Sequence, residues 1–180
     1  LTVEIPCLSV SAPGETTHSG LGDATLGTKL GIWSESAAAP GVALSLEAKL
    51  ANGDETRGLG SGAVNYGGLL RVQKTWGDFT GLGNLGYTLV GEPSIHGERQ
   101  PRGNPWFAAL AQFYALTPAT SLLSEVYLKT AEEPGEPNRF AFDLGAKQNV
   151  LSWLQLQAAI GKSRRAGNEG GPALRVYVGI

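Results

Sequence analysis

The sequence is poor in the residues that most often carry redox or metal chemistry. Its 180 residues include one cysteine, two histidines and no methionine. Cys7 therefore has no partner for an internal disulfide and belongs to no zinc-ligand spacing, and we interpret it as a small packing residue. The sequence predicts no metal site and no cofactor.

Long apolar runs and an excess of charge are also lacking. No stretch of about 18 apolar residues occurs, which excludes a transmembrane helix. The formal net charge of -2, without a basic stripe carrying interleaved aromatics, gives no case for a nucleic-acid partner. Because the chain begins at Leu1 with a strand-like pattern, we expect a processed or truncated product that lacks N-terminal residues.

Glycine and alternating apolar residues are abundant instead. The 26 glycines and 10 prolines favour an all-β protein with many turns. Residues 20–33 show the pattern most clearly: with a period of two, Leu26, Leu30 and Ile32 fall on one face, and Asp23 and Lys29 on the other. A helix would mix these two sets around its circumference, so the period predicts a strand.

The same period recurs along the whole chain and predicts a single domain over residues 1–180. The expected strands cover residues 1–10, 20–33, 42–50, 64–76, 79–90, 106–116, 121–129, 139–147, 154–161 and 173–180. Strands of about 9–13 residues can cross a tilted bilayer. Long polar loops alternate with shorter turns, which predicts an antiparallel, up-and-down transmembrane β-barrel of about ten strands.

Charge falls almost entirely on the polar face of the predicted strands. In a soluble sandwich this face would be the solvated exterior, whereas in a membrane barrel it would line the lumen. The abundance of glycine on the same face favours a crowded concave lumen. Residues 106–116 are apolar on both faces, so their orientation stays open. The predicted lumen charges are Glu4, Asp23, Lys29, Glu47, Lys49, Arg71, Glu125, Lys129, Asp143, Lys147 and Arg175.

Large aromatic residues lie near the ends of the predicted strands. Aromatic girdles mark the two membrane interfaces of transmembrane barrels. The predicted interface aromatics are Trp33, Trp76, Phe79, Trp106 and Trp153.

Several short glycine-rich motifs carry a family resemblance over nearly the whole chain. The clearest are Ser19-Gly-Leu-Gly-Asp23, Leu50-Ala-Asn-Gly-Asp54, Gly58-Leu-Gly-Ser-Gly62, Asn84-Leu-Gly-Tyr87 and Asp143-Leu-Gly-Ala-Lys147. With these motifs the chain resembles the outer-membrane transporter-like β-barrel family named for a meta-pathway of phenol degradation. The chain differs from the family pattern at Ala51-Asn52, where a Pro-Thr pair is usual, and in ending with Ile180 in place of an aromatic residue. The resemblance implies that these residues form most of a twelve-stranded barrel or a closed ten-stranded one.

Catalytic chemistry has little support. His18 and His96 both fall in predicted loops, away from the strand position beside a serine that a lipase-like site would need. The oxygen ligands of residues 52–55 lack EF-hand spacing, so a glycine turn is favoured over a calcium site. Glu132, Glu133 and Glu136 form a solvated loop or, as an alternative, bind divalent cations together with lipopolysaccharide. The sequence predicts no catalytic residue and no enzyme.

The resemblance implies passive, porin-like passage of small compounds, including hydrophobic or aromatic ones, through the bacterial outer membrane. Membrane lipid and lipopolysaccharide are the expected partners, with an envelope protein or a second copy of the chain left open, and the long loops are expected at the cell exterior. A scaffolding barrel with a plugged lumen is the alternative, and a soluble ligand-binding barrel comes third. Since a barrel of about ten strands is little wider than its own side chains, we expect a nearly closed lumen.

Overall fold

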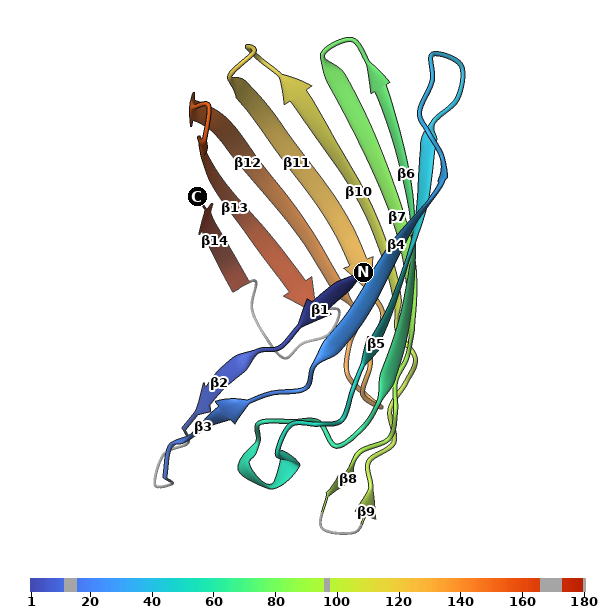
Figure 1. The fold of residues 1–180 in the computed structure, drawn as a ribbon, viewed down its shortest axis with the longest axis vertical. Coiled ribbons are helices and arrows are strands. Elements are labelled where there is room, and N and C mark those ends of the chain that lie inside the picture. Colours follow the sequence, from blue (N-terminus) through green and yellow to red (C-terminus); the bar gives the residue numbers. More distant parts are fainter. Residues whose placement is uncertain (12–15, 96–97, 166–172, 180) are drawn as a thin grey trace.

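The computed structural model describes residues 1–11, 16–95, 98–165 and 173–179, with backbone only at 94–95, 98–99, 165 and 173–178. Ten strands form one antiparallel sheet, and Figure 1 shows them side by side in chain order. Their bounds are β1 (Thr2–Glu4), β4 (Thr25–Trp33), β5 (Gly41–Lys49), β6 (Asn65–Trp76), β7 (Phe79–Leu89), β10 (Trp106–Ala115), β11 (Thr120–Lys129), β12 (Arg139–Leu151), β13 (Leu154–Arg165) and β14 (Ala173–Gly179). None of the described residues belongs to a helix long and apolar enough to cross a membrane.

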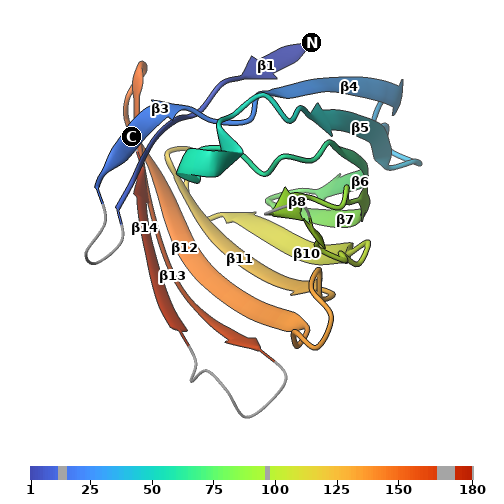
Figure 2. The ribbon, with the colours of Figure 1, turned by 90° about the horizontal axis from the view of Figure 1, so that it is seen from below.

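The up-and-down antiparallel barrel architecture predicted from the alternating pattern is confirmed. Each strand of the large sheet pairs with its neighbour along the chain, and the sheet curls around an interior (Figure 2). Tight turns meet at one rim and the long loops at the other (Figure 1). β1 and β14 form the two edges of the sheet, and no ladder joins them among the residues that the structure describes. In lipid, the free backbone groups of these edges require strand partners.

The first predicted strand, residues 1–10, is wrong as a single element. β1 pairs with β4, whereas β2 (Cys7–Val10) pairs with β3 (His18–Leu21) in a separate hairpin. The break falls at Ile5 and Pro6, because proline has no N–H to donate to a ladder. The Pro6 carbonyl instead accepts a hydrogen bond from the Gly22 N–H at 2.8 Å.

The second predicted strand, residues 20–33, is divided as well. β3 ends at Leu21 and β4 begins at Thr25, so residues 22–24 lie outside both strands. The Ala24 N–H donates to the Asn52 side-chain oxygen at 2.8 Å, and this bond to a distant loop replaces a ladder bond. Asp23 therefore does not project from a strand face, which corrects its predicted place among the strand-borne lumen charges.

Three connections differ from the predicted turns and loops. β12 continues to Leu151, past the predicted strand end at residue 147, so the turn lies at residues 152–153, after an irregular register near Asn149. The loop after β5 contains the short 3-10 helix η1 (Glu55–Arg57), which begins at the capping Asp54. The loop after β7 contains the short hairpin β8 (Ser94–Ile95) and β9 (Glu98–Arg99).

The part of the sheet that the structure describes encloses no conventional hydrophobic core. Among the described residues, the buried apolar side chains are Leu59 and four alanines, and no large side chain is fully buried. A soluble domain of this length would bury most of its leucine, isoleucine and phenylalanine side chains. The apolar residues of this chain must therefore find their apolar surroundings outside the protein.

Candidate functional site

The convex face of the sheet is a continuous apolar wall. The exposed leucine, isoleucine and phenylalanine side chains of strands β4 to β7 and β10 to β13 all lie on this face, and Leu110 is 67% exposed. One row in register joins Leu70, Leu85, Ala108, Leu128 and Phe140. An aliphatic wall several strands wide is the surface that a transmembrane barrel presents to lipid.

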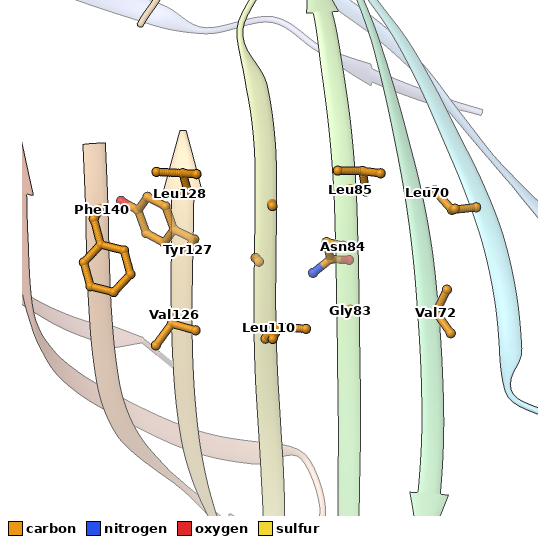
Figure 3. Close-up of a pocket in the computed structure, with 12 residues that line it drawn as sticks. Leu70, Val72, Gly83, Asn84, Leu85, Leu110, Val126, Tyr127, Leu128 and Phe140 are labelled. Atoms are coloured by element: carbon orange, nitrogen blue, oxygen red, sulfur yellow. The ribbon is translucent and has the colours of Figure 1, made fainter. Parts of the chain in front are cut away.

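A shallow groove interrupts this wall where small residues lie between large ones. Its volume is about 360 Å³, and Figure 3 shows Leu70, Leu85 and Leu128 in one line above Val72, Leu110 and Val126. Gly83 lies between Val72 and Leu110 in register and leaves the hollow open. The lining is aliphatic apart from Asn84, Tyr127 and Phe140, and a groove of this kind fits a lipid acyl chain.

The predicted interface aromatics lie at the ends of the apolar wall. Trp76 and Phe79 flank the tight turn after β6 with their ring centroids 6.0 Å apart. Trp33 ends β4, and Trp153 occupies the turn between β12 and β13. At the opposite rim Trp106 packs against Tyr87, and their ring centroids lie 4.6 Å apart. Rings at both rims are the arrangement of aromatic girdles, and their contact with the interfaces stays a prediction.

The concave face carries most of the predicted lumen charges. Lys49 identifies this face, because its ammonium donates to the Ser61 hydroxyl of a loop that lies within the curve of the sheet (Figure 2). The register places the following residues on the same face: Glu4, Lys29, Glu47, Arg71, Glu125, Lys129, Asp143 and Lys147. The backbone of Arg175 pairs with that of Gly161, which pairs in turn with Asp143, and the Arg175 side chain lies outside the described residues. Contact of these charges with a solute stays a prediction.

Glycines on the concave face make room for the neighbouring carboxylates. A Cβ atom at Gly67 would lie 2.7 Å from the Glu47 side chain, and one at Gly161 would collide with the Asp143 carboxylate. Gly67 pairs with Glu47 in register and Gly161 with Asp143. At these two positions the carboxylates fold against the wall, in space that a larger residue than glycine would fill.

An apolar stripe on the concave face could not be assigned from the sequence. Pairing of β10 with β7 and β11 turns Phe107, Ala109, Ala111 and Phe113 inward, in register with inward residues of both neighbours. The Phe107 and Tyr127 rings lie 5.8 Å apart. The stripe also includes Leu69, Leu82 and Leu123. One side of the interior is therefore apolar and aromatic, while charges line the remainder.

Asp23 anchors the loop of residues 50–64 across the long-loop end of the interior. Its carboxylate accepts hydrogen bonds from the Gly53 N–H at 2.9 Å, the Ser61 N–H at 2.8 Å and the Ser61 hydroxyl at 2.6 Å. The Lys49 ammonium lies 3.5 Å from it, and the Asp23 side chain is only 8% exposed. Figure 2 shows the η1 segment of this loop inside the curve of the sheet. The glycine-rich motif that ends at Asp23 thus fastens a partial cover over one mouth.

Burial and hydrogen bonding act on the Asp23 carboxyl in opposite directions. Burial disfavours its charged form, but the hydrogen bonds from Ser61 and Gly53 and the nearby Lys49 ammonium outweigh this effect and lower its pKa. The carboxylate is therefore charged at neutral pH, as an acceptor of three hydrogen bonds requires.

A polar cavity of about 680 Å³ lies beside this loop. Lys49 and Ser61 line one side of it, and Arg102, Glu132 and Glu133 line another. Arg102 forms an ion pair with Glu133. Lys129 forms one with Glu132 at 3.2 Å. Ion pairs thus neutralise much of the charge at this mouth.

The described residues contain no constellation suited to catalysis or metal binding. His18 lies in β3, and its Nε2 atom is 3.5 Å from the Thr16 hydroxyl. His96 lies outside the described residues. Asp54 caps η1 by accepting the Thr56 and Arg57 N–H groups. No group of three or more histidine, cysteine, aspartate or glutamate side chains within the described ranges could hold a metal ion.

Two comparisons with known proteins agree with this geometry. The family model described as "Putative MetA-pathway of phenol degradation" matches residues 4–174. The crystal structure of the COG4313 outer membrane channel from Pseudomonas putida F1 superposes with a TM-score of 0.72 at 18% identity, covering 90% of this chain and 66% of that channel. The chain thus spans slightly less than two thirds of the channel's length, and it has the fold of an outer-membrane channel barrel. No curated protein matches the chain significantly.

Proposed function

Because the chain belongs to the family described as "Putative MetA-pathway of phenol degradation", we propose that it forms a channel in the bacterial outer membrane. Small compounds pass through its interior passively, without a catalysed step. The distribution of side chains between the two faces of the sheet carries this proposal. The aliphatic convex face suits lipid and lipopolysaccharide, and the concave face suits water and solutes.

The concave face also supports a class of solute. The inward stripe of β10 with Leu82 and Leu123 offers an apolar surface, while Arg71 and Glu125 lie in neighbouring rows of the same interior. Apolar or aromatic molecules that carry one polar group match such a divided wall. We include small hydrophobic and aromatic compounds among the solutes.

Ion conductance of the full-length protein in planar bilayers tests the proposal. Discrete channel events are expected, because mixed charges in a wet pore bind and release ions. Arg71→Ala should shift the reversal potential toward cation selectivity and Glu125→Ala toward anion selectivity. Complete absence of channel events, with folded protein inserted in the bilayer, would overturn passage.

The anchored loop favours one alternative, a scaffolding barrel with a plugged lumen. Asp23 holds residues 53 and 61 by three hydrogen bonds, and η1 lies within the curve of the sheet. In a scaffold the Asp23→Ala variant would conduct no better than the wild type. In a channel whose mouth is partly covered, the same variant should raise the single-channel conductance.

A further inference from the structure

A small hollow on the concave face spans four neighbouring strands, β10 to β13. Its volume is about 150 Å³. One row of its lining joins Phe113, Leu123, Gly145 and Ala159 in register. All four positions lie on the interior face of the sheet, the face that carries the apolar stripe.

The hollow owes its depth to small residues between large ones. Phe113 and Leu123 form its apolar side, while Gly145 and Ala159 form its floor. A Cβ atom at Gly145 would lie 2.8 Å from the Ala158 carbonyl oxygen and 3.0 Å from the Ala159 Cβ atom. Glycine is therefore required at this position, and the backbone of β13 approaches closely beneath the hollow.

Hydrogen-bond acceptors lie along one edge of the hollow. Glu125 and Asp143 face each other across the β11–β12 ladder, one row from Leu123 and Gly145, and both line the hollow. Ionised carboxylates only accept hydrogen bonds. The acceptors along this edge therefore favour a ligand that carries a hydrogen-bond donor.

We propose that this hollow is a binding subsite for a single aromatic ring bearing a hydroxyl or amino donor. The hollow is open on one side, and its volume of about 150 Å³ is comparable to that of a closed apolar cavity that binds one benzene molecule. With the ring between Phe113 and the Gly145–Ala159 floor, a donor on the ring reaches the carboxylate edge formed by Glu125 and Asp143. This subsite rests on the proposed channel function, because a solute reaches it through the interior.

The subsite can be tested by ¹⁹F NMR titration of the purified protein in lipid nanodiscs. The probes are 4-fluorophenol, 4-fluorotoluene, which lacks the donor, and 4-fluorobenzoate, which carries an anion. We expect 4-fluorophenol to bind at least about tenfold more tightly than either of the others, the effect of one hydrogen bond to a charged acceptor. Glu125→Gln should reduce this preference.

Two alanines on opposite faces of the sheet provide a matched pair of filling variants. Ala159→Leu fills the floor of the hollow and should weaken 4-fluorophenol binding about tenfold or more, since the cavity no longer accommodates a ring. Ala108→Leu in β10 adds the same volume on the convex face, outside the lining of the hollow, and should leave binding unchanged. Equal binding by the Ala159→Leu variant and the wild type, or tighter binding of 4-fluorobenzoate, overturns the subsite.

Conductance of the same preparations separates the subsite from the channel function. Channel events with equal phenol binding in both filling variants would reject the subsite and leave passage standing. Selective phenol binding that Ala159→Leu abolishes, without channel events, would support the subsite and reject passage.

Discussion

Removing the Asp23 carboxylate should release the loop of residues 50–64 from the mouth of the barrel. In Asp23→Ala the two N–H groups of Gly53 and Ser61 lose their acceptor, and the Lys49 ammonium loses its counter-charge. The Ser61 hydroxyl keeps two partners, the Lys49 ammonium at 2.7 Å and the Ala63 carbonyl at 3.1 Å, and water can enter at the mouth. The net loss is therefore smaller than three full hydrogen bonds.

The size of the effect follows from the charged hydrogen bonds that are lost. One such bond contributes about 1.5–3 kcal/mol. Because water replaces part of the lost interactions, we expect Asp23→Ala to destabilise the closed loop by about 2–3 kcal/mol in total. That free energy corresponds to a roughly 30- to 150-fold increase in the population of the open loop. Arg57 in η1, whose side chain is 61% exposed, gives trypsin a cleavage site on this loop.

Trypsin cleavage at Arg57 in the folded, lipid-embedded protein measures this opening. Cleavage through local opening follows the open population when closing is fast, so the rate should rise by a similar factor in Asp23→Ala. Asp78→Ala, in the tight turn at the other rim, serves as the control. An unchanged cleavage rate in Asp23→Ala would refute the anchoring role of this carboxylate.

The same anchor predicts a pH dependence. The folded-state pKa of Asp23 lies below its ordinary value of 3.8, so its stabilising contribution is complete above that value and is lost as the pH falls through the lower folded-state pKa. Trypsin is inactive in this range, so opening is followed by pepsin cleavage of the loop. Cleavage in the wild type should increase steeply below about pH 4, and Asp23→Ala should show no such step.

Two further pairs of variants test the packing of the sheet and the assignment of its faces. Gly145→Ala should overpack against Ala158, which costs about 1–3 kcal/mol of stability and lowers the melting temperature. Gly83→Ala, whose Cβ atom would lie 3.7 Å from Leu110, should leave the melting temperature unchanged. Equal melting temperatures of the two variants, measured by circular dichroism, would contradict this expectation. Leu110→Arg on the convex face should destabilise the lipid-embedded protein by about 2–4 kcal/mol, and Ala111→Arg on the concave face by much less. A larger loss of stability for Ala111→Arg than for Leu110→Arg, measured by denaturant unfolding in bilayers, would contradict the face assignment.

Where one face of a strand is apolar and the other polar, the sequence was sufficient to predict the strand. Residues 42–50 and 64–76 alternate without ambiguity, and the structure has β5 and β6 at nearly these positions. The period of two follows from the pleat itself, so it requires no knowledge of the partner strand. The family resemblance, stated on short glycine motifs, is confirmed by the match over residues 4–174.

Features that depend on distant partners could not be predicted in this way. Asp23 continues the alternation of the strand after it, yet its carboxylate is bound by donors at Gly53 and Ser61, about 30 and 38 residues further along the chain. The inward face of β10 was undetermined because Phe107 and Ala108 are both apolar. Only its register with Gly86 and Lys129, whose strands alternate clearly, decides which of the two lines the interior.

Cysteine accessibility in membranes tests whether the concave face lines a water-filled path and the convex face contacts lipid. In a Cys7→Ser background, Ala111→Cys and Ala43→Cys place thiols on the concave face, and Ala108→Cys and Ala146→Cys place them on the convex face. In the protein alone the convex pair is the more exposed. We expect the opposite order in outer membranes: a membrane-impermeant maleimide should label positions 43 and 111, and leave 108 and 146 unlabelled. Labelling of positions 108 and 146 in preference to 43 and 111 would contradict the assignment of the two faces to water and lipid.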